Sequence, residues 1–227
     1  MKQHRVNPVR DVVFSAIHSD SRAEALQEFF HRGAQIYVVA GALRDAVAAN
    51  MGEYGSNAPR DFDIAVANIQ REVFDEILQS QGRQNRHGGY VLKQIAAPHW
   101  DVWRMEESIG FRKTETQCSL ENLLRTFNLD CNAIALDLRT GLFLDAGAIA
   151  AIHHRQVDFV EDVIHHSHET FAAKALLLHL RLNYQLTDRM KYFVSRHLEN
   201  ASLMHEAQKI FPGLIVPPMN QRSSFID

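Results

Sequence analysis

Two aspartates one residue apart, Asp61 and Asp63, are the residues of this sequence best suited to chemistry. The alternation DFDI at 61–64 places both carboxylates on one face of a short strand and both apolar side chains on the other. Adjacent carboxylates repel each other unless a cation lies between them, and sites made only of oxygen favour Mg²⁺. The pair therefore predicts a magnesium site; the alternative is an exposed strand end without a ligand.

A turn of small residues precedes this pair. The run IYVV at 36–39 is typical of a buried strand, and AGA at 40–42 allows the backbone to turn sharply and approach a ligand. A helix is predicted over 43–51, with its first backbone N–H groups directed toward the turn and Arg44 in its first turn. Helix starts of this kind bind phosphate. The alternative is an ordinary helix start in which Arg44 and Asp45 form an ion pair.

In order and spacing, the two motifs resemble the head domain of tRNA CCA-adding enzymes and bacterial poly(A) polymerases. These enzymes belong to the DNA polymerase β-like nucleotidyltransferase superfamily. The matching stretches are AGALRD at 40–45 and PRDFDIA at 59–65. The family pattern has two glycines, any residue, a valine and Arg-Asp, followed after a loop by Pro-Lys-Asp-x-Asp-Ile-Ala. Ala40 replaces the first glycine and Arg60 replaces the lysine, and both changes are mild.

The resemblance implies a metal-dependent nucleotidyltransferase. Such an enzyme moves a nucleoside monophosphate from a nucleoside triphosphate (NTP) to an acceptor hydroxyl, with release of pyrophosphate. Asp61 and Asp63 would be metal ligands, and a later strand would supply a third carboxylate. Asp101 in HWDVWR at 99–104 is the candidate, as third ligand or general base; the alternative is a surface aspartate at a sheet edge. A cluster of three carboxylates holds two Mg²⁺ ions, one for the attacking hydroxyl and one for pyrophosphate. The nucleotide-binding residues implied are Ala40, Gly41, Arg44, Asp45, Arg125 and Asn132.

Two further family motifs are altered in this sequence. The family passage Arg-Arg-Asp-Phe-Thr-Ile-Asn-Ala supports the sugar and triphosphate of the nucleotide, and here it reads TFNLDCNA at 126–133. Asn132 and the spacing to Asp145 match, and Arg125 is the candidate to replace a missing arginine. The family's Glu-Asp-x-x-Arg reads the incoming base, and the aligned residues here are SHETF at 167–171. Templated addition of C and A is therefore not expected.

Composition sets limits on the class of protein. A hydrophobic fraction of 46% and a charged fraction of 22% are typical of a soluble globular protein. The formal charge of −3 weighs against a surface dominated by RNA contacts but leaves room for a local basic patch. Cys118 and Cys131 lack metal-site spacing and indicate reduced thiols. The sequence shows neither a signal peptide nor a run long enough to span a membrane, so we expect a cytoplasmic protein without a membrane partner.

The histidines at 153–154 and 165–168 suggest a second metal site, since histidine is a common zinc ligand. Adjacent histidines on a helix point in different directions, and no spacing completes a tetrahedral set. A structural role is therefore expected for them.

Hydrophobic periodicity and the family resemblance together predict an α/β (α+β) fold, and the resemblance implies a small mixed sheet flanked by helices with a helical C-terminal extension. We expect two helices within 11–30, the second capped by Asp20 or Ser21, and an extended segment over 128–137. Further helices are predicted at 69–79, 119–127, 161–184 and 191–210, with Ser119 as the cap at the start of the second of these and a hairpin turn at 87–90. The chain is divided into a head domain at 1–150 and a neck-like helical extension with a Pro-rich tail at 151–227.

Three functions stay open at this point. The first is nucleotidyl transfer to an RNA 3′ end, in which the partners are an NTP and an RNA resembling tRNA. The second is transfer to a protein or a small molecule, which suits the small size and acidic charge. The third is a catalytically reduced nucleotide- or RNA-binding relative that keeps the fold as a regulatory module, as the altered motifs suggest.

Overall fold

The computed structural model describes residues 7–52, 61–92, 98–113, 116–160 and 168–198, together with 205 and 208. Arg60 and the Pro-rich tail lie outside these residues. The helices are α1 (Asn7–His18), α2 (Ala23–His31), α3 (Gly41–Asn50), α4 (Arg71–Leu78), α5 (Ile109–Lys113), α6 (Leu120–Arg125), α7 (Ala148–His153), α8 (His168–Leu182) and α9 (Asp188–Leu198), with the 3-10 helices η1 (Met105–Glu107) and η2 (Asp130–Asn132). The strands are β1 (Gln35–Val39), β2 (Asp61–Ala67), β3 (Arg83–Gln84), β4 (Tyr90–Leu92), β5 (His99–Arg104), β6 (Ile134–Asp137), β7 (Phe143–Asp145), β8 (Gln156–Val157) and β9 (Gln185–Leu186).

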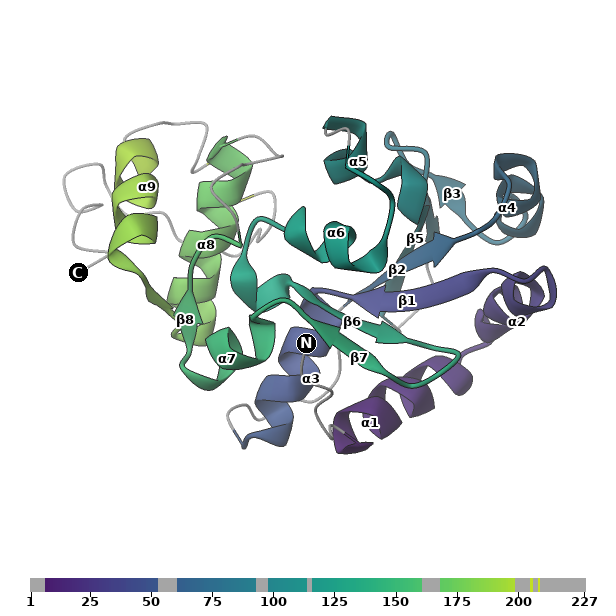
Figure 1. Ribbon diagram of the computed structural model, residues 1–227, viewed down its shortest axis with the longest axis horizontal. Helices are drawn as coiled ribbons and strands as arrows, with labels where there is room; N and C mark the ends of the chain where they lie inside the picture. The colour runs from purple at the N-terminus through teal and green to yellow at the C-terminus, as the bar shows by residue number, and fades with distance from the viewer. Residues whose placement is uncertain are drawn as a thin grey trace.

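A mixed sheet of seven strands forms the centre of the described chain, in the order β3-β4-β5-β2-β1-β6-β7 (Figure 1). Strands β2 and β5 run parallel, whereas the other neighbouring pairs are antiparallel. The parallel register sets Asp63 opposite Asp101 and Asp61 opposite His99. A mixed sheet flanked by helices and followed by a helical extension confirms the predicted fold class.

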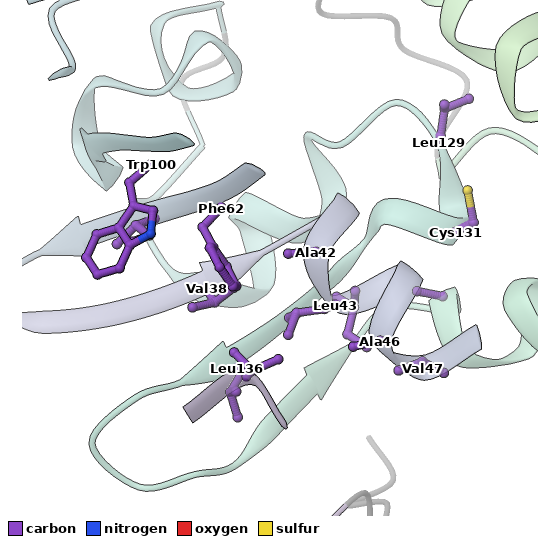
Figure 2. Packing of buried hydrophobic residues seen from close by; sticks show 14 of the residues in the cluster. Val38, Ala42, Leu43, Ala46, Val47, Phe62, Trp100, Leu129, Cys131 and Leu136 are labelled. Atoms are coloured by element: carbon purple, nitrogen blue, oxygen red, sulfur yellow. The ribbon is translucent and has the colours of Figure 1, made fainter. Parts of the chain in front are cut away.

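The two faces of the sheet bury alternate residues of each strand, as the period of two requires. One face packs against α1, α2, α3 and α4, and Figure 2 shows Leu43 of α3 near Leu136 of β6, with Ala46 and Val47 farther along the helix. The opposite face packs against α6 through Leu123 and forms a smaller core cluster. Because Asp61 and Asp63 alternate with Phe62 and Ile64, both carboxylates fall on the thinly covered α6 face. An open space for a ligand is therefore expected there.

The C-terminal helices share the core of the sheet domain. Phe171, Ala175 and Leu176 of α8 belong to the same cluster of buried residues as Val38 and Phe62 of the sheet. Strand β8 pairs in parallel with β9, which lies between α8 and α9. Helix α7 runs across position 150, and the division of the chain into two domains stays a prediction. Among the described helices, none is both long and apolar enough to cross a membrane.

Local details confirm one predicted cap and correct another. The Ser119 hydroxyl accepts a hydrogen bond from Asn122 N at 3.2 Å, which caps α6. The predicted cap of α2 by Asp20 or Ser21 is wrong, because Arg22 occupies the N-cap position without a side-chain cap. The Asp20 carboxylate instead accepts from Arg22 Nε at 2.8 Å and holds the guanidinium over the Trp100 ring. The segment predicted as extended over 128–137 contains η2 before β6.

Candidate active site

The three predicted carboxylates lie on two adjacent strands. Asp61 and Asp63 project from β2, and Asp101 projects from β5 directly beside Asp63. Neighbouring strands are about 5 Å apart, and residues opposite one another in register point to the same face. The parallel pairing of β2 with β5 therefore brings together carboxylates that are separated by about forty residues in the sequence.

A cavity of about 500 Å³ opens over Asp61 and Asp63. One wall comes from the end of β1 and the start of α3, a second from the segment around η2, and a third from α8. A volume of this size is in the range of small-molecule sites. The polar lining residues are Arg44, Asp45, Asp61, Asp63, Asn128, Asn132, Thr170, Lys174 and Arg181.

The carboxylates repel one another in this setting. Burial, together with the charges of Asp61 and Asp101, raises the pKa of Asp63 to about 7. The nearby Lys174 and Arg44 act in the opposite direction without cancelling these effects. Burial also raises the pKa of Asp101. A bound cation would remove the repulsion and keep both groups ionised, so this donor set fits a divalent metal such as Mg²⁺.

The Asp101 carboxylate is held by a hydrogen bond from Asn85 Nδ2 at 2.9 Å. It lines a second cavity of about 150 Å³, and among the described residues the two cavities share Trp103 and Phe127. In this conformation, no three His, Cys, Asp or Glu side chains of the described chain are arranged to hold a metal ion. The geometry therefore presents Asp61 and Asp63 as a pair, and the role of Asp101 as third ligand stays a prediction.

The turn before α3 has an unexpected conformation. Ala40 adopts φ 60° and ψ −125°, a region that favours glycine. Gly41 has no positive φ, and a Cβ added to it would make only an ordinary contact with Arg44 at 3.8 Å. The position that needs glycine is therefore 40, and replacing the family glycine there by alanine is not the mild change expected from the sequence. The carbonyl of Ala40 accepts the first bonds of the helix, from the N–H groups of Leu43 and Arg44.

Arg44 is engaged with protein groups on the cavity wall. Its Nη2 lies 2.7 Å from Asp45 Oδ1, and its Nη1 donates to Asn132 Oδ1 at 2.8 Å. Its side chain is only 13% exposed. The contact with Asp45 is the ion pair that the sequence left as the alternative for this helix start, and the hydrogen bond to Asn132 ties α3 to η2. Arg44, Asp45 and Asn132 all line the cavity, where Arg44 binds the other two, and their role in nucleotide binding stays a prediction.

The structure places some of the predicted residues away from the cavity and brings unpredicted residues into its lining. Arg125 is exposed at the end of α6 and does not line the cavity. Thr170, Lys174 and Arg181 on α8 do line it, although sequence reasoning missed them. The signal was present in their spacing, because residues four and seven apart share one helix face. Among the predicted histidines, His165 and His166 lie outside the described residues, and His153 and His154 are exposed at the end of α7.

A scan of protein-family models finds no match to this sequence, and a search of curated proteins finds none. Solved structures do match. A CCA-adding enzyme in complex with ATP superposes with a TM-score of 0.66 at 16% identity, over 100% of this chain and 55% of that one. The Thermotoga maritima CCA-adding enzyme complexed with tRNA gives 0.64 at 16% identity, over 99% and 55%. A CCA-adding enzyme in complex with CTP gives 0.62 at 17% identity, over 100% and 54%.

The chain spans about half the length of these enzymes. At such low identity the likeness concerns the fold alone. The resemblance inferred from AGALRD and PRDFDIA is nevertheless confirmed at that level, because the same enzymes emerge from the arrangement of the backbone. This chain shares the fold of the corresponding half of the solved CCA-adding enzymes.

Proposed function

We propose that this protein transfers a nucleoside monophosphate from an NTP to an acceptor hydroxyl, with release of pyrophosphate. The observation that carries the proposal is the paired carboxylates of Asp61 and Asp63 at the floor of a cavity large enough for a nucleotide. The fold supports it, since similar enzymes have been solved with ATP and with CTP. A solved relative complexed with tRNA makes an RNA 3′ end the first acceptor to test.

Asp61 and Asp63 would hold Mg²⁺, and Asp101 would join them from β5. The metal, when bound, neutralises charge on the transferring phosphoryl group and on the leaving pyrophosphate. The chain's own residues position the reactants: the turn at Ala40 and Gly41 shapes the wall beside the carboxylates, and Asn85 orients Asp101. Because phosphoryl transfer depends mainly on positioning and charge neutralisation, loss of one ligand should be severe.

The test is incubation of the protein with Mg²⁺, total cellular RNA and each NTP labelled at the α-phosphate in turn. We expect label to enter RNA with the wild-type chain and to fall at least about a hundredfold in Asp61→Asn and Asp63→Asn. Glu76→Gln is the matched control, because Glu76 is an exposed carboxylate on α4 that does not line the cavity. Unchanged labelling by both aspartate variants, with normal folding, would contradict the proposal.

The rival is a relative that binds nucleotide without transferring it. Two observations favour it: Asp101 is hydrogen-bonded to Asn85, and Arg44 is engaged with Asp45 and Asn132. Pyrophosphate release by the wild-type chain, measured beside NTP binding, separates the two functions. A binding-only protein would bind NTP but release no pyrophosphate with any acceptor, including small hydroxyl compounds and protein extracts.

A further inference from the structure

The sequence predicts Arg44 and Arg125 as the cations that bind the phosphate groups, and the structure places neither of them as that prediction requires. Arg44 uses its Nε, Nη1 and Nη2 groups on Asp45 and Asn132, so its charge is compensated inside the wall. The family arginines are replaced by Thr126 and Phe127, and Arg125 does not line the cavity. An NTP nevertheless carries several negative charges that must be offset in a partly dry site. Another wall of the cavity must then supply cations.

Helix α8 presents a cationic stripe to the cavity. Lys174 and Arg181 both line it and are seven residues apart, which places them on one face and about 10 Å apart along the helix axis. Leu177 and Leu178 lie between them and line the cavity as well, which confirms that this face is turned inward. Thr170, one turn before Lys174, adds a hydroxyl to the same stripe.

The stripe begins at the carboxylates. Lys174 is close enough to Asp63 for its charge to act on that carboxyl group, so this end of the stripe faces the predicted metal site. Arg181 lies two turns farther along α8, on the same wall. Both side chains combine a long flexible stem with a cationic head, which allows them to follow a phosphate chain across an open cavity.

We propose that Lys174 and Arg181 bind the phosphate groups of the nucleotide, in the role that residues 126–128 do not fill. This inference rests on the proposed function for the identity of the ligand. It assigns recognition to phosphate and not to the base. The affinities for ATP, CTP, GTP and UTP should therefore depend on the two cations to the same extent.

The test is isothermal titration calorimetry with inorganic tripolyphosphate and with each Mg²⁺–NTP. We expect Lys174→Ala and Arg181→Ala each to weaken binding of tripolyphosphate by about tenfold or more, since charge-assisted hydrogen bonds are lost. Lys174→Arg should retain most of the affinity. Arg196→Ala on α9 is the matched control, because Arg196 is an exposed cation that does not line the cavity. Thermal melts check that each variant is folded.

The outcomes separate this inference from the proposed function. Absence of tripolyphosphate binding to the wild-type chain would overturn the inference, and so would unchanged affinity in both alanine variants. A loss that differs more than about tenfold among the four NTPs would also overturn it, because it would indicate a contact with the base. Tripolyphosphate binding that depends on both cations, without transfer to any acceptor, would support the inference while the proposed function fails.

Discussion

Ionisation of the Asp63 carboxyl group lowers the stability of the folded protein. Its pKa is about 7 in the folded chain against an ordinary value of 3.8, because of burial and the neighbouring Asp61 and Asp101. Between these two values the folded state binds more protons at this group than the unfolded state does. The free energy of unfolding therefore falls as the pH rises from about 4 to about 7, and the cost is complete above pH 7.

The fall in stability with rising pH gives a prediction for Asp63→Asn. In the absence of metal, the variant should be more stable than the wild type at pH 8 by roughly 1–3 kcal/mol, because the amide cannot ionise. At pH 4 the two proteins should differ little. Urea unfolding at both pH values measures this, with Asp11→Asn as the control at an exposed aspartate. Equal effects of Asp63→Asn at pH 4 and pH 8 would contradict the assignment.

A second prediction concerns the turn at residue 40. Ala40 holds a backbone conformation that favours glycine, which stores strain of about 1–3 kcal/mol. Ala40→Gly should therefore raise the free energy of unfolding by about 1 kcal/mol, after the entropic cost of glycine is subtracted. Ala49→Gly, within α3, is the control and should destabilise by about 0.5–1 kcal/mol. Chemical denaturation measures the free energy of unfolding of both variants. A lower value for Ala40→Gly than for the wild type would contradict the claim that the backbone at Ala40 is strained.

At the scale of elements, the packing of α5 against the end of α6 explains why position 126 differs from the family. A Cβ built on Gly110 would overlap the Thr126 side chain, so the two elements are in close contact at this point. The Thr126 side chain is buried and donates to Leu123 O at 2.7 Å. An arginine does not fit here without moving α5. Threonine at this position thus serves packing instead of nucleotide binding.

Introducing the family's arginine at position 126 should therefore destabilise the protein. Thr126→Arg should lower the free energy of unfolding by roughly 1–3 kcal/mol through overpacking, without tightening NTP binding. Thr116→Arg makes the same chemical change at an exposed position and should be nearly neutral. Thermal unfolding and NTP titration of both variants provide the measurement. Tighter NTP binding by Thr126→Arg would show that the position still faces the nucleotide.

Local patterns predicted the elements of the site better than their contacts. The β2 alternation and the Ser119 cap depend on neighbours in the sequence, and both are confirmed. The α2 cap failed because Asp20 binds Arg22, whose guanidinium lies over the distant Trp100. The same limit applies to Arg44, since the sequence motif does not reveal that Asn132 binds it. Long-range partners of this kind are set by tertiary packing.

At the scale of the whole molecule, the cavity depends on segments far apart in the chain. Its walls combine β1 and β2 with η2 and α8, which are separated by about a hundred residues. Helical periodicity alone predicts a buried apolar stripe on α8. That Lys174 and Arg181 face the cavity over Asp61 and Asp63 follows only from the position of α8 beside the sheet. The shared core of α8 with the sheet keeps that wall in place. The mixed sheet and the helical extension could be predicted from the sequence, whereas this wall of the site could not.

The central claim is that Asp61 and Asp63 form a metal site beside a bound nucleotide. Titration of Mn²⁺, as a paramagnetic substitute for Mg²⁺, into the protein with ATP tests it most directly, with electron paramagnetic resonance reporting free Mn²⁺. ATP also binds Mn²⁺ in solution, so each titration is compared with ATP alone. We predict Mn²⁺ uptake by the wild-type chain and Glu76→Gln beyond that of ATP, and its loss in Asp61→Asn and Asp63→Asn. Equal uptake by the wild type and both aspartate variants would contradict the claim.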